Sequence, residues 1–179
     1  MKPDAILRFW FDETGPKQWF AVDSHFDTSI AARFGVVHAQ AAAGELYEWR
    51  ADATGRLAEI IVLDQFSRNI FRDTPGAFAC DAMALVLAQE AVRAGIAAQF
   101  APERRAFLYM PYMHSESRAI HAIAERLFAE PGLDYNLNFE RSHRAIIDRF
   151  GRYPHRNAIL GRVSTPEEIE FLQQPGSSF

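Results

Sequence analysis

The 179-residue sequence contains one cysteine and two lysines, and it lacks any apolar run near the ~20 residues that a membrane-spanning helix requires. A single cysteine excludes an internal disulfide bond, and we expect Cys80 to be a small core residue in a protein from a reducing compartment. Acidic residues occur too early in the N-terminal stretch for a secretory signal peptide. The sequence therefore predicts a soluble cytoplasmic protein with no membrane partner.

Signatures of cofactor and metal sites are also missing. The sequence has no P-loop, no glycine-rich dinucleotide turn, no H-E-x-x-H and no cysteine pair, and it lacks the nucleophile elbow G-x-S-x-G. The formal net charge is −4 and the pI is about 5.9, which argues against a general nucleic-acid-binding protein. We expect no cofactor, no metal and no nucleic-acid partner.

Alternating runs of Val, Ile and Thr between turns, which indicate strands, are absent as well. Apolar residues make up 49% of the chain, and their spacing is helical almost throughout. We predict a single all-α domain over residues 1–179, an antiparallel array of about eight helices. The expected helices cover residues 5–11, 23–43, 55–72, 75–94, 103–110, 115–130, 136–150 and 166–173.

Capping signals set several of these boundaries. Thr54 is the expected N-cap of the third helix, and Thr74-Pro75 that of the fourth. Pro111 should break or kink the chain. Gly151 is a typical C-cap, and residues 165–168 form a capping box. The last helix should then dock through its apolar residues, namely Ile169, Phe171 and Leu172.

The segment from Arg141 to Arg162 contains six arginines and one acid, so its formal charge is +5 in a chain that is acidic overall. Apolar residues between the arginines exclude a solvated tail. Packed arginines need carboxylates, carbonyls or an anionic ligand as partners. The segment therefore predicts a polar site.

The expected helix 55–72 places Asp64, Arg68 and Arg72 in one row, with Gln65 and Asn69 in the adjacent row. The preceding turns are apolar nearly all round, which predicts a central helix. Three interpretations remain open: an ion pair on a solvated face, a buried structural network, or a wall that faces a ligand.

The stretch YMPYMHSES places His114, Ser115 and Glu116 after a proline at a helix junction. His114 and Glu116 could act as a base and its orienting group, or as metal ligands. The alternative is that Ser115 is an N-cap and Glu116 a first-turn acid, which helix physics alone explains.

Donor-rich residues cluster in the basic segment, in and after the expected helix 136–150. Tyr153-Pro154 makes the turn after this helix rigid, and a rigid loop that is rich in donors can hold a carboxylate or phosphate. Alternatively, the arginines clamp loop carbonyls or the carboxylates of Asp64, Glu116 or Asp148. The residues concerned are His143, Arg144, Arg152, His155, Arg156 and Asn157.

Taken together, these motifs resemble a bacterial family of uncharacterised proteins, domain of unknown function 924. The resemblance implies an all-α, tetratricopeptide-like superhelical fold and no established activity. The matching stretches are residues 9–11, 63–72, 109–116, 150–162 and 164–168.

We predict a pocket for a small anionic molecule, a carboxylate or phosphate. Asp64, His114 and Glu116 would perform acid–base work. The ligand-binding residues would be Arg68, Asn69, Arg72, His143, Arg152, His155, Arg156 and Asn157. One alternative is a scaffold that binds acidic peptides or a C-terminal carboxylate in an arginine-lined groove. The other is a purely structural polar network. The sequence makes no prediction of a reaction or an oligomeric state.

Overall fold

The computed structural model describes residues 1–178, and every regular element in that range is helical, which confirms the all-α prediction. The α-helices are α1 (Pro3–Arg8), α2 (Pro16–Trp19), α3 (Ser24–Ala42), α4 (Ala53–Ile61), α5 (Ser67–Ile70), α6 (Asp81–Arg93), α7 (Pro102–Met113), α8 (Arg118–Phe128), α9 (Asp134–Phe150) and α10 (Pro166–Leu172). Two π-helical turns are η1 (Phe9–Glu13) and η3 (Val62–Phe66). Four 3₁₀ turns are η2 (Tyr47–Ala51), η4 (Pro75–Phe78), η5 (Ile96–Gln99) and η6 (Pro154–Arg156).

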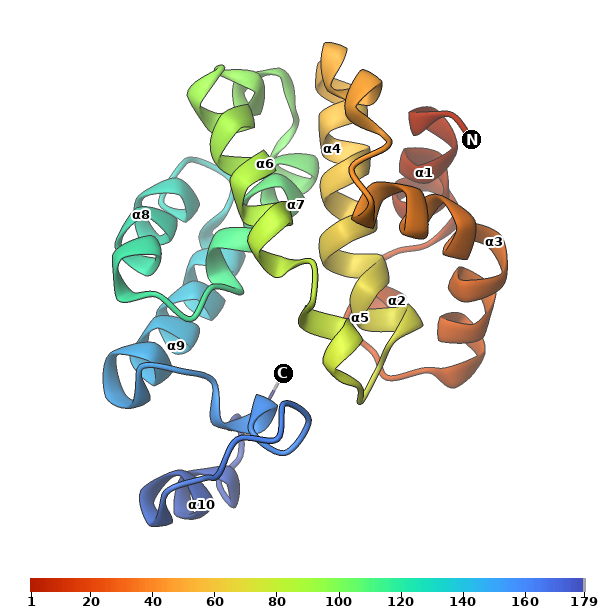
Figure 1. The fold of residues 1–179 in the computed structure, drawn as a ribbon. Coiled ribbons are helices and arrows are strands. Elements are labelled where there is room, and N and C mark those ends of the chain that lie inside the picture. Colours follow the sequence, from red (N-terminus) through yellow and green to blue (C-terminus); the bar gives the residue numbers. More distant parts are fainter. Residues whose placement is uncertain (179) are drawn as a thin grey trace.

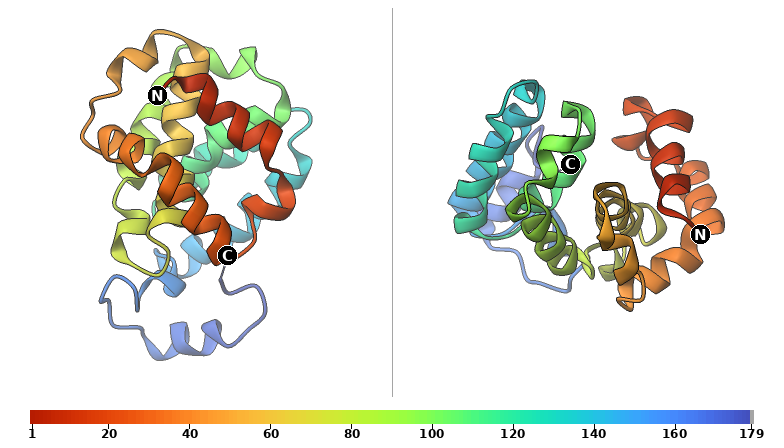
Figure 2. Two further views of the ribbon diagram at one scale, coloured as in Figure 1. Left: turned by 90° about the vertical axis from the view of Figure 1, so that its right-hand side faces the viewer. Right: turned by 90° about the horizontal axis from the view of Figure 1, so that it is seen from above.

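Helix α4 occupies the centre of the fold, as its apolar sequence predicts. It contacts α1 on one side and α6 and α7 on the other, and Figures 1 and 2 show the N-terminal helices and α6–α9 on opposite sides of it. Leu57, Ile60 and Ile61 are completely buried in this position. The later helices pack in sequence, α6 on α7, α7 on α8 and α8 on α9.

Two hydrophobic cores of unequal size form. The main core contains a cluster of aromatic rings, in which Trp10 contacts both Phe66 and Phe107, with 5.6 Å between ring centroids in each pair. A smaller core joins Ile146, Ile147 and Tyr153 near the C-terminus. Cys80 is buried in the main core, as predicted. None of the helices described has the length and apolar character that crossing a membrane requires.

The structure contains the predicted helix 55–72, but its start and its middle differ from the prediction. Its N-cap is Asp52 rather than Thr54, because the Asp52 carboxylate accepts from the Gly55 N–H at 2.8 Å. The chain can turn here only with glycine, since a Cβ at Gly55 would lie 1.8 Å from the Trp49 carbonyl oxygen. In the middle, the π-helical turn η3 separates α4 from α5.

Three other expected boundaries are wrong. Thr74-Pro75 begins only the short turn η4, and α6 starts later, at Asp81. Pro111 does not end its helix: α7 continues through it to Met113, and the His114 N–H donates to the Met110 carbonyl at 3.0 Å just beyond it. Helix α8 starts only at Arg118, so Ser115 is not an N-cap.

The C-terminal predictions hold except for one side chain. Gly151 ends α9 with φ +71°, and the capping box at Thr165 and Glu168 is present. Phe171 packs on Phe150, but Ile169 is 52% exposed. The reason is that α10 docks through one face only, and Glu168 and Phe171, three residues apart, occupy it.

Candidate functional site

Four segments that are distant in the sequence meet between the two cores. The turn η3 contributes Asp64, the start of α6 contributes Asp81, the end of α7 contributes His114, and η6 contributes Arg156. Their side chains and that of Arg68 form one connected set of hydrogen bonds, which we call the Asp64 network. The sequence identified four of its members and missed Asp81, which resembles an ordinary first-turn acid of an alanine-rich helix.

Asp64 is completely buried and fully engaged. One carboxylate oxygen lies 2.8 Å from His114 Nδ1 and 3.4 Å from Arg68 Nη1, and the other accepts from the Gln65 amide at 2.6 Å. Burial by itself raises the pKa of Asp64, but His114, Arg68 and Gln65 together lower that pKa well below its usual range. Asp64 is therefore a carboxylate, held in place from three sides.

The π-helical turn helps to position this carboxylate. Within η3, backbone carbonyls accept bonds from side chains of the next turn: Leu63 from the Ser67 hydroxyl at 2.5 Å, and Asp64 from Arg68 at 2.7 Å. Insertions of this type are frequent where a helix carries functional groups. Here the turn allows Asp64 and Arg68 to point toward α6 and α7 together.

His114 is oriented by Asp64. Because a carboxylate can only accept, the 2.8 Å contact requires a hydrogen on Nδ1, which makes Nε2 the basic nitrogen of a neutral ring. Nε2 has no hydrogen-bond partner among the described residues, and it is not one of their buried unpaired atoms, so it is accessible from the cleft. Burial, followed by the charge of Arg68, lowers the pKa of His114. The imidazole is thus neutral near pH 7 and able to accept a proton.

Two guanidinium groups share the Asp81 carboxylate. Arg68 binds it with two hydrogen bonds of 2.8 and 3.1 Å, whereas Arg156 reaches it once, at 3.2 Å. Arg156 also donates to the His114 carbonyl at 3.0 Å. Burial and the neighbouring Arg68 lower the pKa of Arg156, the opposite of the change seen at Arg68. Arg156 is therefore a buried cation whose charge is incompletely balanced, and its Nε has no hydrogen-bond partner within residues 1–178.

A cleft of about 320 Å³ opens beside these groups. Its lining combines apolar side chains from η4, α6 and α7 with the polar groups of Asp81, His114, Ser115, Glu116 and Arg156. The lining residues are Phe78, Ala79, Asp81, Ala82, Leu85, Pro111, His114, Ser115, Glu116 and Arg156.

Glu116 lines the cleft but is already engaged. Its carboxylate accepts two bonds from Arg162, at 2.6 and 2.9 Å, and one from the Tyr153 N–H at 2.8 Å. Burial alone raises the pKa of Glu116, but these donors lower that pKa overall. In this geometry Glu116 ties the 153–162 loop to the α7–α8 junction.

Other arginine and asparagine residues named from the sequence lie outside the cleft. Asn69 and Arg72 both bind Asp27 of α3, the arginine with bonds of 2.5 and 2.8 Å. Arg152 and Asn157 both bind Glu168 of α10. These contacts join helices to one another, so most of the conspicuous guanidinium groups have carboxylate partners within the chain.

His143 is buried and His155 is half-buried beside Tyr153, and neither lines the cleft. His143 lies 2.8 Å from the Phe139 carbonyl through Nδ1, and the rings of Tyr153 and His155 are 5.6 Å apart. Burial lowers the pKa of His143 to about 3 and that of His155 to about 4. Both side chains are therefore neutral in the folded protein at ordinary pH.

These two pKa values predict a loss of stability in mild acid. A histidine whose pKa is lowered by folding contributes stability above its unfolded pKa, near 6.5, and this contribution declines as the pH falls toward the folded value. We expect the free energy of unfolding to fall by about 1–2 kcal/mol per histidine between pH 7 and pH 5. Urea unfolding at the two pH values measures this fall in the free energy of unfolding. The fall should be smaller in His143→Asn than in the parent. Equal stability of the parent at both values would contradict the prediction.

A second buried pair, absent from the sequence predictions, supports the α7–α8 junction. His121 Nδ1 lies 2.7 Å from the Glu140 carboxylate, and its Nε2 lies 2.8 Å from the Ser115 carbonyl and must carry a hydrogen. Burial raises the pKa of Glu140, whose other oxygen has no hydrogen-bond partner in the described chain. The pair is neutral overall whichever residue holds the shared proton. It fixes the backbone immediately after His114.

Ser67 and His38 form a buried pair that resembles a hydrolase dyad, with 2.7 Å between Ser67 Oγ and His38 Nε2. Ser67 is completely buried, and its hydroxyl donates to the Leu63 carbonyl. This serine cannot reach a substrate and supports η3 instead. Within residues 1–178, no three His, Cys, Asp or Glu side chains are arranged to hold a metal ion.

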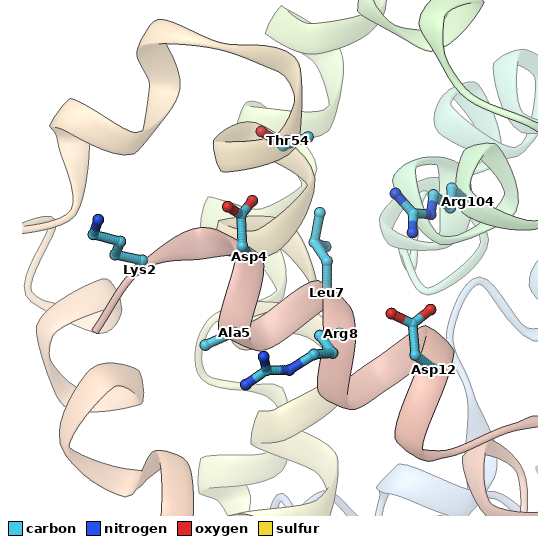
Figure 3. A pocket seen from close by; sticks show the side chains of 8 residues that line it. All are labelled: Lys2, Asp4, Ala5, Leu7, Arg8, Asp12, Thr54 and Arg104. Atoms are coloured by element: carbon cyan, nitrogen blue, oxygen red, sulfur yellow. The ribbon is translucent and has the colours of Figure 1, made fainter.

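A second pocket, of about 420 Å³, lies on the surface where α1 approaches α4 and α7. Figure 3 shows its charged side chains spread around a wide rim rather than directed at one point. Asp4, Arg8 and Asp12 are exposed to solvent there. It lacks the buried, mutually oriented groups found beside His114.

Comparisons with known proteins place the chain among proteins without an assigned activity. The family model described as "Bacterial protein of unknown function (DUF924)" matches residues 6–176. A solved structure of a protein of unknown function from Agrobacterium tumefaciens is 40% identical in sequence, and the match covers 96% of each chain with a TM-score of 0.91. A comparison with curated proteins finds no match.

Proposed function

Because this chain belongs to the DUF924 family of bacterial proteins, which has no described activity, we propose a function from the geometry of the cleft. The cleft binds a small molecule with a carboxylate or phosphate group, and His114 exchanges a proton with that molecule. The observation that carries the proposal is the Asp64–His114 pair, with Nε2 accessible from the cleft.

The chemistry of this pair supports a role as general base and acid. A buried carboxylate that holds Nδ1–H fixes the tautomer of the ring and stabilises the imidazolium that forms when Nε2 takes a proton. Arg68 opposes this by lowering the pKa of His114. The result is a neutral base near pH 7, which would return the proton readily to a leaving group.

Arg156 supports the choice of an anionic ligand. It lines the cleft, its charge is incompletely balanced by Asp81, and its pKa is lowered by burial and by Arg68. A carboxylate or phosphate beside it would supply the missing negative charge, for which a guanidinium group is well shaped. The cleft volume of about 320 Å³ also suits a small molecule better than an extended peptide.

An anion titration tests the binding part of the proposal. Phosphate, sulfate or a small polycarboxylate should raise the melting temperature more than chloride does at matched ionic strength, and the rise should saturate. A ligand at a hundredfold excess over its Kd adds about 2.7 kcal/mol, a shift of roughly 5–10 °C for a domain of this size. Exclusion of sulfate from protein surfaces stabilises without saturation, so the shape of the curve separates the two effects.

Two arginine variants provide the control. Arg156→Met should abolish the saturating shift, while Arg152→Met, which loses contacts to Glu168 outside the cleft, should keep it despite a lower starting stability. A linear rise that is equal in all three proteins would favour the purely structural interpretation of the network. Saturation by acidic peptides but not by small anions would favour the scaffold instead.

Histidine NMR tests the proton-exchange part. The Nδ1–H tautomer of His114 should be observed at pH 7, and a bound anion should raise the pH at which Nε2 takes a proton, because it adds negative charge near the ring. Asp64→Asn should weaken the preference for this tautomer. An unchanged titration of His114 in the presence of a saturating anion would place the ligand elsewhere.

A further inference from the structure

The cleft is lined by apolar as well as polar side chains. Ala82 and Leu85, three residues apart, share a face of α6, and Phe78 at the end of η4 lines the same cleft. Phe78 and Leu85 are half-buried, and Ala82 is exposed.

The same helix has a separate face for the core. Ala84, Ala88 and Ala91 are completely buried there, which accounts for the packing of α6 on α4 and α7. The small side chains Ala79 and Ala82 leave space over the cleft that larger residues would fill. Phe78 and Ala82 lie outside the main core, whereas Leu85 also packs against it, so the apolar stripe borders the face that stabilises the fold.

The apolar stripe adjoins the polar end at Phe78. The Arg156 guanidinium lies 4.5 Å from the centroid of the Phe78 ring, and that of Arg68 lies 5.8 Å away. Pro111 of α7 closes the other side of the cleft beside His114. The charged group of a ligand at Arg156 would therefore lie next to apolar surface.

We propose that the ligand is an amphiphilic anion: a carboxylate or phosphate at Arg156 and His114, joined to an apolar chain or ring that lies along Phe78, Ala82 and Leu85. This inference rests on the proposed function and adds the substrate class. The head supplies charge complementarity to Arg156, and the tail covers apolar surface that water otherwise contacts.

A series of straight-chain carboxylates from acetate to octanoate tests the substrate class by calorimetry or NMR. Each added methylene should tighten binding about threefold to fourfold, the value expected for burial of one CH₂ group, until the chain outgrows the cleft. Ala82→Gln and Ala79→Gln, which place a long polar side chain over the stripe, should remove this dependence on chain length. Val86→Gln is the matched control, since Val86 is exposed on α6 and does not line the cleft.

The outcomes separate this inference from the proposed function. If acetate and phosphate bind and Arg156→Met abolishes binding, but affinity is independent of chain length, the amphiphilic ligand is refuted and the proposed function stands. If longer chains bind Arg156→Met as tightly as the parent, the assignment of the head to Arg156 is overturned. If neither the carboxylate series nor phosphate binds, both proposals fail.

Discussion

Asp64→Ala should lower the free energy of unfolding by about 3–5 kcal/mol, because it leaves buried charged and polar partners without their acceptor. The carboxylate is completely buried and binds Arg68, His114 and Gln65. After its removal, the carboxylate partner left to Arg68 would be Asp81, which it already shares with Arg156. Chemical unfolding in urea, followed by circular dichroism, measures the loss.

Asp148→Ala is the matched control for this variant. Asp148 is also an aspartate paired with an arginine of its own helix, Arg144, but its side chain is 51% exposed. Pairs of this kind contribute little, so the control should stay within about 0.5 kcal/mol of the parent. Equally small losses in both variants would mean that solvent reaches the Asp64 network and that burial does not strengthen it.

Asp64→Asn separates the charge from the shape of the side chain. Its oxygen can still accept from His114 Nδ1, but its amide would face the Gln65 amide at 2.6 Å, donor against donor, unless Gln65 turns over. We expect an intermediate loss of stability. The rise in melting temperature that an anion causes by binding at Arg156 should persist in this variant, since the cleft keeps the Arg156 cation.

Local rules predicted the helices whose boundaries depend on neighbouring residues. The C-cap at Gly151 and the capping box at Thr165 and Glu168 are examples, because each motif satisfies backbone groups within a few residues. The turn η3 could not be predicted in this way. Its carbonyls are satisfied by Ser67 and Arg68, and the orientation of Arg68 depends on Asp81, thirteen residues away.

The candidate site was predicted in its residue types but not in its pairings. Asp64, His114 and Arg156 were named from three separate motifs, and they do meet. Asp81, the partner that Arg156 shares with Arg68, gave no signal, because an acid in a first helical turn needs no other explanation. Pairings between distant segments, such as Glu116 with Arg162, follow from tertiary structure, for which spacing in the sequence gives no rule.

Glu168→Ala should be the second most damaging change, with an expected loss of about 2–4 kcal/mol. Glu168 accepts two bonds from Arg152, at 2.7 and 2.8 Å, and one from Asn157 at 3.2 Å, and it completes the capping box through the Thr165 N–H. The Glu168 side chain therefore connects α10 to Arg152, just before the 153–162 loop, and to Asn157 within that loop. That loop carries Arg156, so the variant should also weaken the anion-dependent shift.

Glu170→Ala is the local control, because Glu170 is an exposed glutamate in the same helix, and it should change stability by less than about 0.5 kcal/mol. Truncation after Arg162 should cost at least as much stability as Glu168→Ala, because the contact of Phe171 with Phe150 is lost too. Hydrogen bonds from Arg152 and Thr165 lower the pKa of Glu168 to about 2 from 4.5. The Glu168 carboxylate therefore makes its full contribution to the free energy of unfolding above pH 4.5, and this contribution is lost as the pH falls toward 2. The difference in stability between the parent and Glu168→Ala should shrink over that range. A difference independent of pH would show that the carboxylate charge is not what holds α10 in place.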